Sequence, residues 1–195
     1  MNYLVHLYLS DPDPDCQLGN LMGDFVKGPL SGEFAPGIRR GMIQHRAVDT
    51  FAQANAAFRR SKRRLDGRFG HCKGVMIDIF YDHILASNWE RFATESLEEF
   101  AARTYRILEA NSARLPAGLR RVAPRMIAGN WLVSYREPQT VATVLCRLAA
   151  RLSRPTPMAE GAGELTSHRL GLTDDCELFL SEARAHLDAI GQVPS

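Results

Sequence analysis

Two short segments of this chain carry metal-binding residue types at the spacing of one helix face. They are His45-Arg46-Ala47-Val48-Asp49 and Asp78-Ile79-Phe80-Tyr81-Asp82-His83. Residues four positions apart lie on the same side of a helix, so each segment can present two ligands together. Imidazole and carboxylate groups set in apolar helices suit a divalent cation that acts on phosphate.

Two further polar residues interrupt apolar segments near the start of the chain. Asp24 follows Gly23, and His6 lies within Tyr3-Leu4-Val5-His6-Leu7-Tyr8-Leu9. A buried carboxylate needs a partner or a metal ion, and the apolar neighbours of Asp78 and Asp82 favour the same interpretation there. Taken alone, His6 is equally explained as a hydrogen-bonded core histidine and Asp24 as the end of a helix.

Arg46 and His83 are the neighbours best placed to assist such a site. The planar guanidinium of Arg46 suits a phosphate oxygen, although an ion pair with Asp49 or Asp82 would also explain it. His83 could be a ligand, a proton carrier or a partner that orients a carboxylate. No chemical role is predicted for the histidines outside these segments, which are His71, His168 and His186.

The composition is that of an ordinary globular protein, with 195 residues, 45% of them hydrophobic and 24% charged. No apolar run is long enough to span a membrane, and the first residues lack the pattern of a secretory signal. We therefore expect a cytoplasmic protein. The four cysteines are far apart and form no CxxC pair, so neither a zinc knuckle nor a disulfide framework is expected.

Basic residues concentrate in one segment, although the net charge is only +2. The arginines predicted to bind a partner there are Arg59, Arg60, Arg63 and Arg64. A solvated helix face would explain the run equally well. As a docking surface it would suit an acidic partner: a nucleic acid, a nucleotide or an acidic protein. The absence of interleaved aromatic residues weakens the case for single-stranded nucleic acid.

Hydrophobic spacing predicts an all-α, single-domain helical bundle over residues 1–195. Asn2 is expected to cap the first helix, and the Pro- and Gly-rich segment 154–163 to form a mobile loop. The other helices are expected at 15–26, from Pro36 through Asp49, and at 55–65, 73–92, 96–111, 118–134, 138–152 and 173–190. No P-loop, GxGxxG or GxSxG motif occurs.

Five segments in series resemble the acyl carrier protein phosphodiesterases, which remove the 4′-phosphopantetheine arm from holo-acyl carrier protein. They are Met1–Leu7, Gly19–Gly28, His45–Asp49, Asp78–Leu85 and Trp131–Arg136. These segments extend over about the first two-thirds of the chain, and nothing after Arg151 contributes to the resemblance.

The resemblance implies an all-helical hydrolase, similar to a variant HD-domain phosphohydrolase, that depends on Mn²⁺ or Mg²⁺. The HD dipeptide itself is absent, and Asp82-His83 has the reverse order. The ligands of HD enzymes are therefore not transferred to this chain. The predicted metal-site residues are His6, Asp24, His45, Asp49, Asp78 and Asp82. The predicted catalytic residues are Asp24, Arg46 and His83.

The resemblance also implies a reaction and a partner. Water activated by the cation would attack the phosphorus that joins the arm to a carrier-protein serine, while Arg46 shares the charge of the phosphoryl oxygens. The products would be apo-acyl carrier protein and 4′-phosphopantetheine. Because acyl carrier proteins are acidic, the arginine-rich segment would steer their approach, and no nucleic-acid partner is expected.

Two other functions remain open from the sequence. An HD-like phosphohydrolase could act on a nucleotide or cyclic dinucleotide, with Tyr81 or Tyr135 stacking on the base. A helical binding module without enzymatic activity would use the same acid pairs structurally, and divalent metals would not stabilise it.

Overall fold

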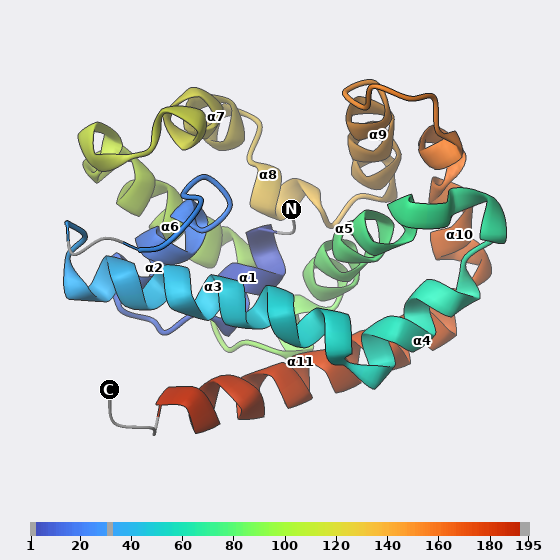
Figure 1. Cartoon of the computed structure of the whole chain (residues 1–195), viewed down its shortest axis with the longest axis horizontal. Coiled ribbons are helices and arrows are strands. Elements are labelled where there is room, and N and C mark those ends of the chain that lie inside the picture. The colour runs from blue at the N-terminus through green and yellow to red at the C-terminus, as the bar shows by residue number, and fades with distance from the viewer. Residues whose placement is uncertain (1–2, 31–32, 192–195) are drawn as a thin grey trace.

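The chain folds into α-helices joined by short turns, and a computed structural model describes residues 3–30 and 33–191 (Figure 1). No strand occurs within these ranges, which confirms the predicted all-α class. The α-helices are α1 (Tyr3–Leu9), α2 (Pro14–Met22), α3 (Pro36–Ala54), α4 (Ala56–Arg64), α5 (Lys73–Ser87), α6 (Leu97–Ala110), α7 (Ala117–Ala128), α8 (Trp131–Ser134), α9 (Pro138–Ala149), α10 (Ala162–Ser167) and α11 (Arg169–Gly191). None of these helices is long and apolar enough to cross a membrane.

Short 3₁₀ helices occur between some of the α-helices: η1 (Gly67–Cys72), η2 (Trp89–Arg91), η3 (Ser112–Arg114) and η4 (Pro157–Glu160). The prediction of a single helix over 118–134 is wrong. The segment is divided into α7 and α8 at Asn130, whose φ of 42° is left-handed. The predicted loop 154–163 contains η4, whose Met158 is buried. Asn2, predicted to cap α1, lies outside the described residues.

Helices α2 and α3 cross at unusually close range, and glycine makes this possible. A Cβ atom on Gly19 would collide with the backbone of Ile38, and one on Gly41 would collide with the backbone of Cys16. Gly23, just after α2, leaves no room for a side chain against the ring of His45. The crossing therefore brings the end of α2 directly against the histidine of α3.

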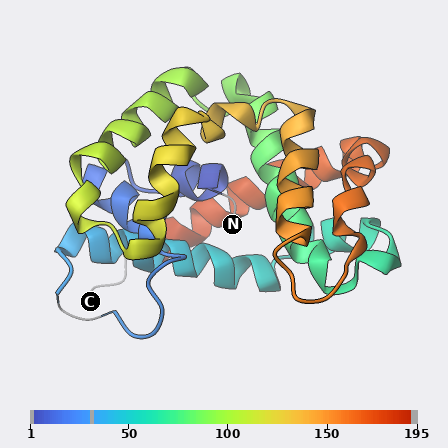
Figure 2. The same ribbon diagram turned by 90° about the horizontal axis from the view of Figure 1, so that it is seen from above.

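Helix α1 is short and lies at the centre of the fold, in contact with α2, α5 and α11 (Figure 1 and Figure 2). The first amides of a helix have no partner within the helix itself. The fully buried carboxylate of Asp82 on α5 accepts hydrogen bonds from two of them, Leu4 at 3.2 Å and Val5 at 2.9 Å. This contact fixes the N-terminus of α1 against α5.

Helix α4 is attached to α11 by a second buried carboxylate, that of Asp175. It accepts hydrogen bonds from Arg60 Nε at 2.6 Å, Arg64 Nε at 3.1 Å and Ser61 Oγ at 3.1 Å. The Ser61 hydroxyl also lies 2.9 Å from the hydroxyl of Tyr81 on α5. One carboxylate thus joins α4 to α11, and Ser61 extends the network to α5.

Replacing Asp175 by Asn is expected to lower the free energy of unfolding by about 2 kcal/mol, because charge-assisted hydrogen bonds to two arginines are lost. Urea unfolding followed by circular dichroism would measure the change. Asp174→Asn is a matched control, since the neighbouring Asp174 is exposed. Equal stability of the two variants would contradict this role for Asp175.

Candidate active site

Three predicted ligands from two helices meet in one cluster. The ligand atoms of His6, His45 and Asp49 all lie within 4.8 Å of one another. The rings of His6 and His45 stack with their centroids 3.9 Å apart, and His6 Nε2 lies 3.2 Å from Asp49 Oδ1. Both histidines are buried, whereas the side chain of Asp49 is 59% exposed. The cluster therefore opens to solvent on the side of Asp49.

Asp24 adds a second carboxylate to this cluster. Its Oδ1 lies 3.6 Å from His45 Nε2, and Asp49 Oδ2 lies 3.5 Å from the same nitrogen. On the opposite side of the ring, His45 Nδ1 lies 3.3 Å from Asn20 Oδ1, an oxygen that can only accept. With its proton on Nδ1, His45 donates to Asn20 and presents the lone pair of Nε2 to two carboxylates. Only a proton or a cation at that position satisfies all three groups.

The electrostatics of the cluster agree with this geometry. Burial raises the carboxyl pKa of Asp24, but hydrogen bonding to His45 and its charge outweigh burial, so the net shift is downward. Asp49 follows the same pattern, with His6 as its hydrogen-bonding partner. Burial lowers the pKa of His6. The site thus combines ionised carboxylates with a histidine that stays neutral, which is the protonation state of metal ligands.

Buried polar atoms without a partner occur in the cluster and on residues near it. Within the described part of the chain, His6 Nδ1, Asn20 Nδ2 and the Tyr3 hydroxyl have no hydrogen-bond partner. Buried polar groups are normally paired, so unpaired ones next to a cluster of ligands indicate a site that receives a further group.

Asp82 and Asp78, the acid pair of α5, lie outside the three-residue cluster. Both oxygens of Asp82 accept amides of α1, as described above. Asp78 instead lines a cavity of about 660 Å³ beside the cluster. Burial raises the pKa of each carboxyl to about 7. For Asp78 the negative charges of Asp49 and Asp24 add to this rise, so Asp78 is electrostatically coupled to the cluster.

The other two predicted catalytic side chains are engaged with backbone carbonyl oxygens. Arg46 donates from Nη1 to Gly28 and from Nη2 to Val26, both at 2.8 Å. Gly28 has a left-handed φ of 80°, so Arg46 holds the turn that follows Asp24. His83 Nδ1 lies 2.8 Å from the carbonyl oxygen of Tyr135. The structure thus groups neither Arg46 nor His83 with the histidine cluster.

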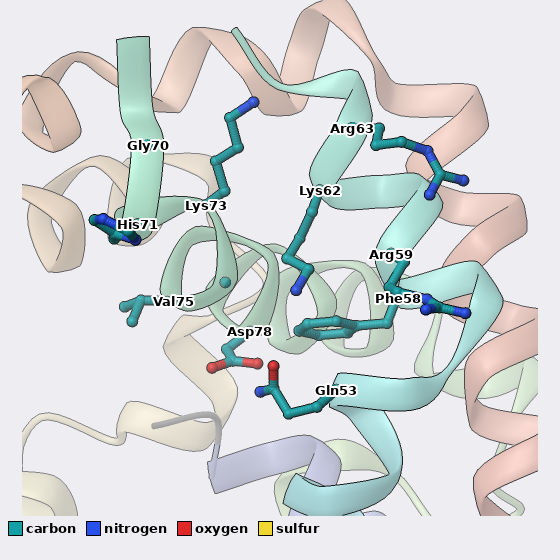
Figure 3. Close-up of a pocket in the computed structure, with 11 residues that line it drawn as sticks. Gln53, Phe58, Arg59, Lys62, Arg63, Gly70, His71, Lys73, Val75 and Asp78 are labelled. Atoms are coloured by element: carbon teal, nitrogen blue, oxygen red, sulfur yellow. The ribbon is translucent and has the colours of Figure 1, made fainter. Parts of the chain in front are cut away.

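The cavity beside the cluster is basic. Its lining residues are Gln53, Phe58, Arg59, Lys62, Arg63, Gly70, His71, Lys73, Gly74, Val75 and Asp78 (Figure 3). Gln53 lies one helical turn beyond Asp49 on α3, so the cavity begins about 6 Å along that helix from the cluster. We call this cavity the basic pocket.

The four predicted docking arginines of α4 divide between two faces of the helix. Arg60 and Arg64 point to Asp175 and are part of the fold. Arg59 and Arg63 are exposed, line the basic pocket and make no ion pair within the described residues. Lys62 lies on the same side as this second pair, over the ring of Phe58.

Several residues of the site were not assigned from the sequence, namely Asn20, Gln53, Lys62, His71 and Lys73. Helical spacing could have indicated two of them, since Asn20 precedes Asp24 by four positions and Gln53 follows Asp49 by four. Tyr81 and Tyr135, proposed as platforms for a nucleotide base, are both buried. Neither offers a free face for stacking.

The helical fold thus places a histidine–carboxylate cluster next to a pocket of cations, a combination of groups that suits the hydrolysis of a phosphate ester. The family model described as acyl carrier protein phosphodiesterase matches residues 1–183, and the chain belongs to that family.

Curated relatives agree with this family. The acyl carrier protein phosphodiesterase of Pectobacterium atrosepticum is 27% identical over 169 residues, which is 86% of this chain and 88% of the relative. The protein of the same name from Yersinia pestis is 27% identical over 182 residues, 93% of each chain. No solved structure matches the chain, so the likeness to HD-domain phosphohydrolases stays a prediction.

The raised pKa of Asp78 predicts a pH-dependent stability. Its folded-state pKa of about 7 exceeds the usual value of 3.8, so the folded protein retains a proton that the unfolded chain releases. The free energy of unfolding should therefore fall as the pH rises from about 4 through 7. Asp78→Asn removes this titration, and wild type should lose on the order of 2 kcal/mol more than the variant between pH 5 and pH 8. Urea unfolding at both pH values would measure this, and equally steep losses would contradict it.

Proposed function

We propose that this chain hydrolyses the phosphodiester bond between 4′-phosphopantetheine and the serine of holo-acyl carrier protein. The family supports the reaction, and the observation that carries it is the contiguity of two features: a histidine–carboxylate cluster and a pocket of cations adjoin along α3. A phosphodiester next to an acidic protein surface needs both kinds of group.

The cluster fits a divalent cation with mixed nitrogen and oxygen ligands. His6, His45 and Asp49 would hold it together with Asp24, and the position of His45 Nε2 between the carboxylates of Asp24 and Asp49 is the supporting observation. When bound, a cation such as Mn²⁺ or Mg²⁺ lowers the pKa of water and neutralises phosphoryl charge. Asp82 is proposed to act indirectly, because its bonds to α1 hold His6 in place.

The remaining residues near the cluster orient its ligands. Asn20 fixes which nitrogen of His45 carries the proton, and Arg46 holds the turn after Asp24. With both terminal nitrogens of Arg46 occupied, we assign it to positioning Asp24 rather than to phosphate. His83 is proposed to stabilise the chain at Tyr135. The four cysteines are free, and we propose that the protein acts in the reducing cytoplasm.

The acidic carrier protein would approach over the exposed basic side of α4. Arg59 and Arg63 have no anionic partner within the described chain, whereas Arg60 and Arg64 already share Asp175. Docking is therefore proposed for the first pair only. Complementary charge at such a rim accelerates and orients encounter.

The reaction is tested by the intact mass of holo-acyl carrier protein after incubation with this protein and Mn²⁺. We expect the mass of the apo form, with no change in the presence of a chelator. Asp49→Asn should lower kcat/KM by at least about 100-fold, because it removes a proposed ligand. His168→Asn is a matched control, since His168 pairs with Glu164 away from the cluster.

Thermal unfolding separates metal binding from catalysis. Mn²⁺ should raise the melting temperature of wild type and of His168→Asn, but not that of Asp49→Asn. An unchanged carrier-protein mass with a metal-stabilised wild type would refute the proposed substrate while leaving the metal site in place. Unchanged stability of every protein would argue for the binding-module alternative.

Charge reversal tests the docking surface. Arg59→Glu with Arg63→Glu should raise KM for the carrier protein about tenfold at low salt, and the difference should shrink as ionic strength rises. The matched control is Arg39→Glu with Arg106→Glu, an equal charge change at exposed arginines of α3 and α6. Equal effects of the two double variants would show that only net charge matters.

A further inference from the structure

The basic pocket holds more positive charge than its anions balance. Its lining includes four cations, Arg59, Lys62, Arg63 and Lys73. Asp78 carries the one carboxyl group among the described lining residues. Burial raises the pKa of this carboxyl to about 7, so near neutral pH Asp78 offsets at most one of these positive charges and only in part. A cavity with such an excess of cations is suited to an anion.

Lys62 occupies the inner part of this pocket. Unlike the exposed Arg59 and Arg63, it is partly buried, with its ammonium 5.4 Å from the ring centroid of Phe58. It makes no ion pair within the described residues, while Lys73 donates to the carbonyl oxygen of Leu65 at 2.7 Å. Lys62 is therefore a cation held in place by an aromatic ring and left without a counter-ion.

Lys62 also faces the wall that separates the pocket from the cluster. Figure 3 shows its side chain directed toward Asp78 and Gln53. The Asp78 carboxyl responds electrostatically to Lys62 as well as to Asp24 and Asp49. Asp78 thus lies within electrostatic range of both the cluster and Lys62, so an anion bound at Lys62 would lie next to the cluster.

The pocket has room for a phosphoryl group with an organic substituent. Its volume of about 660 Å³ lies in the range of small-molecule sites. Gly70 and Gly74 line it, and a Cβ atom on either would meet no atom within 4 Å, so the space in front of both backbones is open. Phe58 is buried and offers no free face to a nucleobase.

We propose that the basic pocket binds a phosphoryl group without the help of a metal ion, and that Lys62 is the central residue of this binding site. That the bound phosphoryl group is the one carried by the phosphopantetheine arm rests on the proposed function. Lys62 thereby takes the phosphate-binding role that the sequence suggested for Arg46.

The test is isothermal titration of chelator-treated protein with inorganic phosphate. Wild type should bind phosphate saturably, and Lys62→Met should weaken binding by about tenfold or more, the cost of losing a charge-assisted hydrogen bond. Lys62→Arg should retain part of the affinity. Arg39→Met is the matched control, because it removes the same charge from an exposed position of α3. Along that helix, Arg39 lies about 20 Å from Gln53 of the basic pocket.

Absence of saturable binding, or equal weakening by Lys62→Met and Arg39→Met, would overturn the proposal. A kinetic measurement separates it from the proposed function, because phosphate should inhibit arm release competitively in wild type and much less in Lys62→Met. If no arm is released but phosphate binding depends on Lys62, the substrate is wrong and the phosphoryl site stands. If the arm is released but phosphate binding is insensitive to Lys62, the site is wrong.

Discussion

The hydrogen bonds between the Asp82 carboxylate and the first amides of α1 are the contact on which the site depends. Helix α1 has seven residues, too few to be stable alone, and it enters the core with unsatisfied amides. Asp82 satisfies two of them and thereby places His6, one residue further along, against the ring of His45. Without this anchor, the one ligand that α1 contributes has no defined position relative to those of α3.

The close crossing of α2 and α3 supplies the other half of the site. Glycines at 19, 23 and 41 let backbone and ring approach where any side chain would collide. As a result, Asn20 and Asp24 reach opposite nitrogens of His45. Small residues at the crossing thus determine which polar groups face the two ring nitrogens of a histidine that belongs to another helix.

The positively charged side chains of α4 fall into two groups with different surroundings. Arg60 and Arg64 turn inward to the buried Asp175 and stabilise the fold, whereas Arg59, Lys62 and Arg63 have no anionic partner in the described chain and surround the basic pocket. The difference follows from the helical repeat, because positions four apart share a face. Fold stability and the proposed anion binding therefore use adjacent residues of the same segment.

The sequence by itself determined the helical class and the family, and it indicated the segments that carry the proposed ligands, because hydrophobic periodicity and the spacing of His45 and Asp49 are local properties of one helix. The partners of Asp82, Arg46 and His83 and the surroundings of Asp78 were decided only by tertiary structure. A carboxylate can bind a metal ion or accept from a backbone amide, a guanidinium can donate to a phosphate or to a carbonyl oxygen, and an imidazole can bind a metal ion or donate to a carbonyl oxygen. Which partner it meets depends on helices distant in the chain: α1 for Asp82, α4 for Asp78 and the turn at Gly28 for Arg46. Spacing along one helix carries no information about the element packed against it.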